Sequence, residues 1–217
     1  MDKQVSQSHY SSERYAFSGR WVSYYHQVKE SLALSPKSIL EIGVGDKVFG
    51  SYLKANTEIS YTALDIAEDL KPDILGSVTD IPCPDNSFDV VCAFQILEHL
   101  PFSEFDKACS EIARVSKIGA LISLPHFGPP VKFSFKLPFL RGVYFAWKIP
   151  FPKKHTFNGQ HHWEIGKKGY SAQKIRDVLS RYFLIEKEFI PFENQYHRFY
   201  VLKKVKSDGV GVLSSPE

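Results

Sequence analysis

Two glycines and an acid have the spacing of a nucleotide-binding turn. Gly43 and Gly45 directly follow the apolar run 38–42 and precede a segment of helical periodicity. Glycine adopts backbone angles that other residues avoid, and without a Cβ atom it lets a ligand lie against the main chain. Asp65 ends a second apolar run, where a strand-end carboxylate can bind both hydroxyls of a ribose. These residues predict a cofactor site, although a structural turn and a helix N-cap can carry the same residue types.

The glycine spacing also distinguishes between cofactor classes. A dinucleotide-binding turn reads G-x-G-x-x-G and would have its third glycine where Val48 stands, so NAD and FAD are disfavoured. Glu41 precedes the first glycine by two residues, in the order E-x-G-x-G. This turn resembles that of class I S-adenosylmethionine (AdoMet)-dependent methyltransferases of the type 11-like group. The resemblance continues through residues 76–91, which are similar to the family's G-D-A-x-x-L-P-F-x-D-x-S-F-D-x-V segment, and covers residues 39–125.

The resemblance implies a fold and a cofactor site. The fold is α/β, with a Rossmann-like, mostly parallel seven-stranded sheet, helices on both faces and a terminal antiparallel hairpin. Ligands of such sheets bind beyond the carboxyl ends of the strands. The residues expected to bind AdoMet, from the turn and its amino-acid end to the ribose and adenine, are Glu41, Gly43, Gly45, Asp65, Ser77, Val78 and Asp80. Lys47 stands where many members have a third glycine, so we expect altered contacts near the methionine part of AdoMet.

Histidines are the candidates for acid–base chemistry. His99 follows the fourth expected strand and His126 the fifth, and a neutral imidazole can take a proton from an acceptor hydroxyl. A local hydrogen bond that orders the loop is an equal alternative for His99. Adjacent histidines on an extended segment point in opposite directions, so at most one of residues 161–162 faces a substrate. We expect His162 and Trp163 to bind the acceptor.

The sequence Q-x-x-E-H at residues 95–99 bears on metal binding. It resembles the E-x-x-E-H of ubiquinone-type O-methyltransferases, in which the acids and the histidine bind a divalent cation. Gln95 replaces the first acid, and an amide oxygen is a poorer ligand for a hard cation than a carboxylate. We therefore expect no metal.

Regular elements alternate along the chain, as a parallel sheet requires. The expected strands are 38–42, 59–66, 73–75, 88–93, 120–124, 183–191 and 196–203. The expected helices are 19–34, 48–55, one that Ser103 caps and Gly119 stops, and one that Ser171 caps and that runs to Tyr182. The first helix is expected to cover the sheet with the apolar stripe Trp21, Tyr24, Tyr25, Val28 and Leu32.

We expect three parts in the chain. Residues 1–18 form a flexible lead, residues 19–205 the methyltransferase domain, and residues 206–217 a disordered tail. Within the domain, residues 125–169 lose all periodicity and are basic and aromatic, with Glu164 as their single acid. Connections this long are usually functional, and we expect this insertion to close over the acceptor.

Composition limits the partners and the compartment. The net charge of +3 is too small to imply nucleic acid by itself. Three cysteines without C-x-x-C spacing, and no signal peptide or apolar span, predict a soluble cytoplasmic protein that can still touch a membrane surface. We expect methyl transfer to a small-molecule or lipid- or saccharide-linked acceptor. An RNA methyltransferase or nucleic-acid-binding protein, and a non-catalytic AdoMet-fold protein, remain alternatives, the first because basic and aromatic residues alternate in the insertion.

Overall fold

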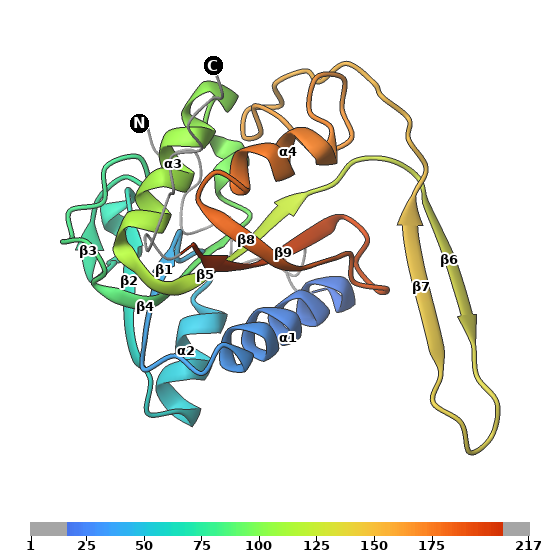
Figure 1. Cartoon of the computed structure of the whole chain (residues 1–217), viewed down its shortest axis with the longest axis horizontal. Coiled ribbons are helices and arrows are strands. Elements are labelled where there is room, and N and C mark those ends of the chain that lie inside the picture. Colours follow the sequence, from blue (N-terminus) through green and yellow to red (C-terminus); the bar gives the residue numbers. More distant parts are fainter. Residues whose placement is uncertain (1–16, 206–217) are drawn as a thin grey trace, which may run out of the picture.

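The computed structural model describes residues 17–205, which build one seven-stranded sheet with helices on both faces (Figure 1). The strand order is β3-β2-β1-β4-β5-β9-β8. The first five strands of this order are parallel, and β9 and β8 are antiparallel. The strands are β1 (Ser38–Ile42), β2 (Ser60–Asp65), β3 (Ile74–Leu75), β4 (Phe88–Phe94), β5 (Ser116–Pro125), β8 (Phe183–Phe189) and β9 (His197–Lys204). This arrangement confirms the predicted fold class and its terminal antiparallel hairpin.

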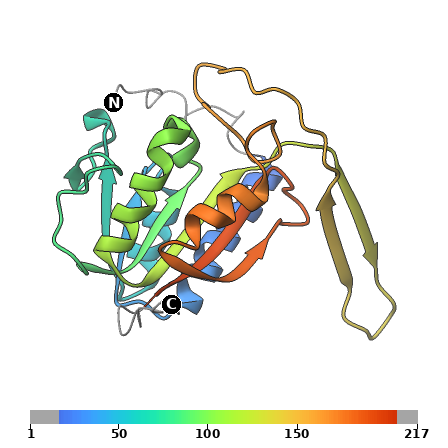
Figure 2. The ribbon, with the colours of Figure 1, turned by 45° about the horizontal axis from the view of Figure 1, so that its top comes forward.

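The central strands are buried on both faces because helices cover each of them. Helices α1 (Ser18–Ala33) and α2 (Val48–Asn56) lie on one face, and α3 (Phe102–Val115) and α4 (Ala172–Leu179) on the other (Figures 1 and 2). In β4, Val90 packs in the core beside α2, whereas the next residue, Val91, packs in the core beside α3 and α4. Two-sided burial explains why these strands read as continuous apolar runs.

Helix α1 has the predicted position, and Val28 and Leu32 of the predicted stripe pack against the core, but the rest of its buried face differs from the prediction. Trp21 and Tyr25, expected in the buried stripe, are 57% and 58% exposed. The buried face is small and polar and includes Ser23, whose hydroxyl lies 2.9 Å from His197 Nδ1 and accepts a hydrogen bond from the side-chain amide of Asn194. A polar face can be buried here because its hydrogen-bond partners come from the start of β9 and the turn before it, which the helical period alone does not reveal.

Two predicted helix boundaries are wrong and one is confirmed. Helix α3 begins at Phe102 after Pro101, so Ser103 lies inside it and caps nothing. It ends at Val115, and Gly119, expected to stop it, lies within β5. A Cβ atom on Gly119 would lie 1.9 Å from the carbonyl oxygen of Leu202, so this glycine permits the close approach of β9. The expected cap of α4 is confirmed, because the Ser171 hydroxyl accepts a hydrogen bond from the amide of Lys174.

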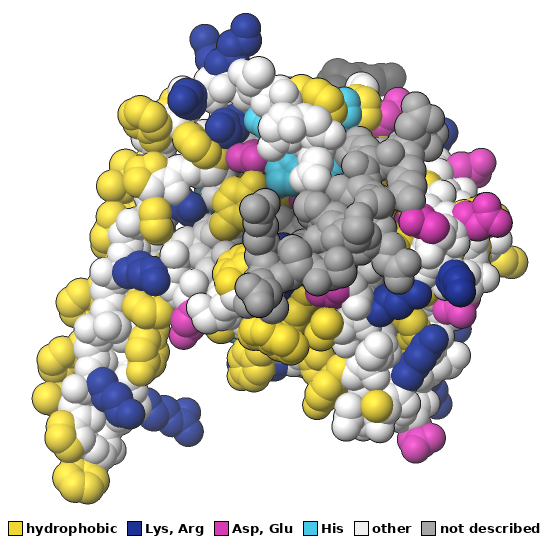
Figure 3. Space-filling view, turned by 180° about the vertical axis from the view of Figure 1, so that it is seen from behind, with side chains coloured by type: hydrophobic (Ala, Val, Ile, Leu, Met, Phe, Trp, Pro, Cys, Tyr) yellow, Lys and Arg dark blue, Asp and Glu magenta, His cyan; other side chains and the backbone are white. Residues whose placement is uncertain are grey.

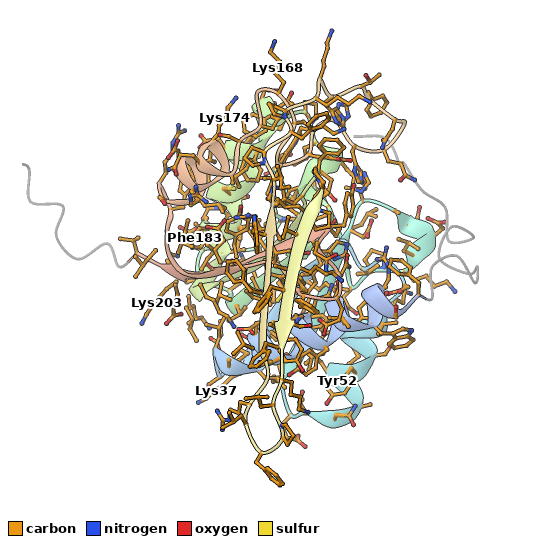
Figure 4. The ribbon with its side chains drawn as sticks, turned by 90° about the vertical axis from the view of Figure 1, so that its right-hand side faces the viewer. Lys37, Tyr52, Lys168, Lys174, Phe183 and Lys203 are labelled. Carbon is orange, nitrogen blue, oxygen red and sulfur yellow. The ribbon has the colours of Figure 1, made fainter. Side chains whose placement is uncertain are left out.

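The segment 125–169, expected to lack regular structure, contains a long hairpin. Strands β6 (Pro130–Phe135) and β7 (Val143–Lys148) form a separate two-stranded sheet that projects from the body (Figure 1). Hydrophobic and basic side chains intermix along it (Figure 3). It starts near the end of the molecule where Lys168 and Lys174 point outward and runs toward the end that carries Tyr52 and Lys37 (Figure 4). The expectation of no regular structure is wrong here, because β6 alternates Val131, Phe133 and Phe135 on one face with Lys132 and Ser134 on the other.

The predicted lead and tail lie largely outside the described residues. Residues 1–16 and 206–217 are not described, so neither expectation is tested there. None of the helices within residues 17–205 combines the length and the apolar character that a bilayer crossing needs.

Candidate cofactor and acceptor site

A cavity opens at the carboxyl ends of β1, β2 and β4, next to the point where the strand order reverses. Its floor is the turn after β1, and its walls come from the ends of β2 and β4 and from the N-terminal half of α1. The lining residues used below are Arg20, Tyr24, Gln27, Glu41, Gly43, Gly45, Asp46, Asp65, Leu70, Val78, Gln95, Ile96, His99 and Leu100. Topology therefore places the cavity where ligands of open α/β sheets bind.

The glycine turn needs its glycines for two reasons. Gly43 and Gly45 have φ angles of +79° and +47°, in the left-handed region. A Cβ atom on Gly43 would also lie 2.3 Å from Cγ2 of Ile96, in the loop after β4. Lys47 has a φ of +64° as the N-cap residue of α2, so it occupies the conformation that a third glycine would adopt without strain. The turn keeps its shape despite this lysine.

Asp65 ties the end of β2 to the glycine turn. Its Oδ2 accepts a hydrogen bond of 3.0 Å from the amide of Val44, and its Oδ1 accepts one of 2.9 Å from the amide of Ala67. A carboxylate oxygen has a second lone pair, so the same side chain can also accept from a ligand in the cavity. The N-cap-like hydrogen bond and the ligand role, which the sequence left as alternatives, are compatible.

Glu41 is a buried acid on the cavity wall. It is 4% exposed, and its carboxyl accepts a hydrogen bond from the hydroxyl of Tyr61 rather than from the turn's main chain. Burial raises the pKa of Glu41 to about 8, against the effect of the Tyr61 hydrogen bond, and the charges of Asp46 and Asp65 raise it further. Burial and the nearby Glu41 raise the pKa of Tyr61 far above its usual range.

Helix α1 supplies cavity residues that the sequence analysis missed. Arg20, Tyr24 and Gln27 line the cavity. The Tyr24 hydroxyl donates a hydrogen bond to Asp46 of the glycine turn. The i, i+3/i+4 spacing of these three residues indicates that they share one face of the helix. Only the tertiary structure shows that this face meets the glycine turn.

The expected adenine residues divide between cavity and surface. Val78 is buried and lines the cavity beside Leu70. Ser77 and Asp80 are not among the described residues that line it, and Asp80 is exposed. The Ser77 hydroxyl instead lies 2.9 Å from that of Thr79 and closes the local turn. The predicted adenine side therefore consists mainly of apolar side chains.

The structure separates the two candidate catalytic histidines. His99 lines the cavity, and burial together with the charge of His161 lowers its pKa to about 4. His126 does not line it and lies on a second cavity at the base of the hairpin. Its Nδ1 accepts a hydrogen bond from Nε of Arg198, and burial and that charge lower its pKa to about 3. His126 directly follows β5, which ends at Pro125, and it lies at the base of the hairpin rather than in the cavity that His99 lines.

Trp163 is a core residue rather than a substrate contact. It is fully buried, donates a hydrogen bond of 3.1 Å from its indole N–H to the carbonyl of Leu100, and packs edge-on against Phe102 and Phe105. The prediction that Trp163 contacts an acceptor is therefore wrong. His162 is partly exposed and packs against Phe157, outside the described lining of the cavity.

The cavity is acidic. Glu41, Asp46 and Asp65 line it, and Arg20 is the one lysine or arginine among its described lining residues. Near pH 7 the negative charge comes from Asp46 and Asp65, because Glu41, with a pKa of about 8, keeps its proton. This charge lies at the end of the sheet where a glycine turn exposes main-chain atoms, so the site suits a ligand with a cationic end.

The comparisons with known proteins point to a methyltransferase domain. Residues 40–124 match the sequence profile of a methyltransferase domain family, which covers the glycine turn, Asp65 and His99. Over residues 40–124 the chain therefore has the sequence pattern of a methyltransferase domain, which supports the predicted resemblance to class I, type 11-like methyltransferases. No curated protein matches the sequence significantly.

Solved structures share the fold at low sequence identity. An N-methyltransferase, NodS, from Bradyrhizobium japonicum, crystallised with S-adenosylhomocysteine, has a TM-score of 0.58 at 9% identity over 87% of this chain and 89% of its own. The 1,6-didemethyltoxoflavin-N1-methyltransferase of Burkholderia thailandensis has a TM-score of 0.57 at 13% identity over 86% and 81%. The [4+2]-cyclase SpnF has a TM-score of 0.51 at 15% identity over 81% and 79%. A fold shared with a cyclase shows that the chemistry has to be argued from the site.

Proposed function

We propose that the protein binds AdoMet in the acidic cavity and transfers its methyl group to an acceptor that enters beside His99. The observation that carries this proposal is the combination of the glycine turn with Glu41, Asp46 and Asp65 on one cavity wall. The sulfonium and ammonium groups of AdoMet outnumber its carboxylate, so this field attracts it. The pyrophosphate of NAD or FAD would be repelled by the carboxylates of Asp46 and Asp65. The match to a methyltransferase domain family and the S-adenosylhomocysteine bound to NodS support the proposal.

Each cavity region has a part of AdoMet that it suits. Gly43 and Gly45 expose main-chain atoms to the amino-acid end, and Asp65 faces the ribose. Val78 and Leu70 offer an apolar surface to the adenine. Glu41 acts through Tyr61 and the local field. AdoMet supplies an activated methyl group on sulfur, so the chain's main task is to align the acceptor atom with it and to exclude water.

The acceptor side begins at the end of β4. Gln95, Ile96 and His99 line the cavity there, and Gln95 has a φ of +55°, a strained angle that is common at functional sites. The toxoflavin precursor of the Burkholderia enzyme is a small molecule, which supports a small-molecule acceptor here. We place the reacting acceptor atom beside His99. His162 remains a candidate for an acceptor contact only if the loop that carries it moves.

The hairpin extends the proposal to a lipid-linked acceptor. Its end carries Leu137, Phe139 and Leu140, which are exposed, between the basic residues Lys136 and Arg141. Residues 126–163 contain no acid. Exposed apolar side chains flanked by cations suit the interface of an anionic membrane. We therefore propose that the hairpin touches a membrane surface from which a lipid- or saccharide-linked acceptor reaches the cavity.

Calorimetric titration with candidate cofactors tests whether the protein binds AdoMet. We expect AdoMet and S-adenosylhomocysteine to bind with one site per chain and NAD to give no heat. The acidic wall predicts that Asp46→Asn weakens AdoMet binding, and Asp69→Asn, outside the lining, serves as its control. Absence of binding heat and of a thermal shift with AdoMet would favour a non-catalytic protein of this fold.

Binding of the protein to vesicles and to RNA tests the proposed membrane contact of the hairpin. We expect co-sedimentation with vesicles of phosphatidylcholine containing phosphatidylserine, and loss of it in a Phe139→Ser, Leu140→Ser variant. Phe157→Ser, an exposed aromatic elsewhere in the insertion, is the control. Salt-dependent binding of single-stranded RNA without vesicle binding would favour the nucleic-acid alternative instead.

A further inference from the structure

A carboxylate is buried beside the cavity without a hydrogen-bond partner. Glu98, in the 3-10 turn Leu97–His99 after β4, is fully buried. Neither of its carboxylate oxygens has a hydrogen-bond partner within residues 17–205. Removing an ionisable group from water without such partners is costly, so buried carboxylates are normally paired or bind a metal ion. A buried carboxylate such as that of Glu98 therefore calls for a partner that the hydrogen bonds within residues 17–205 do not supply.

Two histidines converge on this carboxylate from different segments. One ligand atom each from Glu98, His99 and His161 lie within 4.8 Å of one another. Nε2 of His161 is 3.9 Å from Oε1 of Glu98, and the rings of His99 and His161 stand nearly perpendicular, 5.2 Å apart. The two segments are joined by backbone, because the amide of His162 donates to the carbonyl of Glu98 at 2.9 Å. This hydrogen bond holds the segment of His161 against the turn that carries Glu98 and His99.

A second layer of polar groups orients the histidine from the loop. Nδ1 of His161 is 3.1 Å from Oε1 of Glu164, and the Tyr196 hydroxyl donates to the same oxygen at 2.9 Å. A carboxylate on Nδ1 directs Nε2 of that ring toward Glu98. This carboxylate–histidine pairing is the usual outer shell of a metal-binding imidazole. Nδ1 of His99 lies 3.0 Å from the carbonyl oxygen of Gln160, which holds the second ring to the same loop.

We propose that Glu98, His99 and His161 bind a divalent transition-metal ion, with Zn²⁺ as the best match. Two imidazoles and one carboxylate are a recurrent Zn²⁺ ligand set, whereas Mg²⁺ and Ca²⁺ prefer oxygen ligands throughout. Tetrahedral Zn²⁺ with bonds of about 2.0–2.1 Å needs ligand atoms about 3.3 Å apart, so the cluster has to contract slightly. For His99 this means giving up one of its hydrogen bonds to the backbone of Gln160 and Gln95 in exchange for the metal ion.

The proposed ion lies where it can act on the acceptor. His99 belongs both to the cluster and to the lining of the cavity, so an ion bound by the cluster would adjoin the proposed acceptor site. An ion there would attract an oxygen atom of the acceptor and hold it beside the methyl donor. This consequence rests on the proposed methyl transfer, whereas metal binding itself does not. It replaces the expectation of no metal, which considered Gln95 and did not foresee that His161 completes the set.

Metal titration of the full chain without an affinity tag tests the site. After removal of metals with a chelator, we expect Zn²⁺ to bind with one site per chain and to raise the melting temperature. X-ray absorption should give a first shell of nitrogen and oxygen ligands without sulfur. Glu98→Gln and His161→Gln should each weaken Zn²⁺ binding at least about 100-fold, and Glu164→Gln about 10- to 100-fold. His162→Gln, next in sequence but outside the cluster, should bind as the wild type does.

The outcomes separate this site from the cofactor site. Glu98→Gln keeps the size of the side chain, and its AdoMet affinity checks that the domain is folded. Zn²⁺ affinities that are equal in wild type, Glu98→Gln and His161→Gln would overturn the proposal, and so would a wild type that binds AdoMet but no Zn²⁺. In the latter case the three side chains form only a hydrogen-bonded cluster. A protein that binds Zn²⁺ but no AdoMet would refute the proposed function and leave the metal site standing.

Discussion

The carboxylate of Asp65 accepts a hydrogen bond from the amide of Val44, so the residue proposed to hold the ribose also holds the glycine turn. Its other oxygen accepts from Ala67 at the start of the next loop. Ligand contact and local structure are therefore coupled at this side chain. A substitution here changes both, and its effects on binding and on stability have to be measured separately.

Asp65→Ala removes two acceptors from backbone amides as well as the proposed ribose contact. Each hydrogen bond to a charged group contributes about 1.5–3 kcal/mol. We expect AdoMet affinity to fall by at least about tenfold, and the free energy of unfolding without ligand to fall too. Calorimetry and chemical denaturation measure the two effects. Asp80→Ala, an exposed acid outside the cavity lining, should change neither, and AdoMet affinity retained in a folded Asp65→Ala variant would contradict the ribose assignment.

Gly43→Ala should disturb the cavity more than the same change at a glycine of similar conformation. At Gly43 the added Cβ atom meets Ile96, whereas Gly159, with a φ of +91°, has nothing within 4 Å of a Cβ atom. Both variants pay the backbone cost of about 1–2 kcal/mol, so the difference between them isolates the contact with Ile96. We expect Gly43→Ala to lose AdoMet binding and Gly159→Ala to keep it. Equal affinities in the two variants would mean that AdoMet does not lie on this turn.

Glu41 should make stability depend on pH. In the folded protein its pKa is about 8, above the ordinary value of 4.5, because it is buried near Asp46 and Asp65. The folded chain then holds a proton that the unfolded chain releases, so the contribution is full below pH 4.5 and is lost as pH rises to 8. Each pKa unit corresponds to about 1.4 kcal/mol.

Denaturation of the wild type and Glu41→Gln at several pH values measures this contribution. The wild type should lose stability relative to the variant between pH 5 and 8, by at least about 1.4 kcal/mol. Parallel curves for the two proteins would show that Glu41 is ionised in the folded state. Tyr61→Phe removes the hydrogen bond to Glu41 and should raise the pKa of the acid further.

The hairpin should be removable without loss of the cofactor site. Its aromatic contact with the body is Tyr144 against the ring of Phe192. Val131 and Trp147 are paired across it, so Asn-Gly can replace residues 132–146 between them as a tight turn. We expect AdoMet affinity and melting temperature close to those of the wild type, and loss of vesicle binding. Loss of AdoMet binding would show that the hairpin supports the fold.

The whole of 125–169 should not be removable in this way. It contains Trp163 and Ile165, which are fully buried in the core beside α3 and α4. Replacing this entire segment by a short linker would expose that core, so we expect unfolding. The expected insertion thus consists of a projecting hairpin and a loop that is part of the domain.

The cofactor turn was predictable from sequence because its determinants are local. The spacing of Gly43, Gly45 and Asp65 relative to two apolar strands indicates where the turn forms, and their roles toward a cofactor are proposed from it. The cluster around Glu98 was not predictable from the sequence. His161 is far from Glu98 along the chain and reaches it only through the tertiary structure. Residue types alone also misplaced Trp163, since an aromatic side chain in an irregular segment reads equally well as a surface contact or as core.

The buried face of helix α1 also could not be assigned fully from the sequence. Its apolar residues suggested which face is buried, yet the buried face carries Ser23 and Gln27. The Ser23 hydroxyl is hydrogen-bonded to Asn194 and His197, and Gln27 lines the cavity. Helical periodicity can assign a face only where burial is apolar, and the residues of α1 that reach the cavity were missed for that reason.

Hydrogen–deuterium exchange with and without AdoMet tests the central claim most directly, because it locates the ligand. We predict slower exchange in peptides that cover residues 43–48 and 65–68, the end of β4, and the N-terminal half of α1. Exchange in the hairpin, residues 130–148, should stay unchanged. Protection confined to other segments, or no protection under saturating AdoMet, would contradict the assignment of this cavity as the cofactor site.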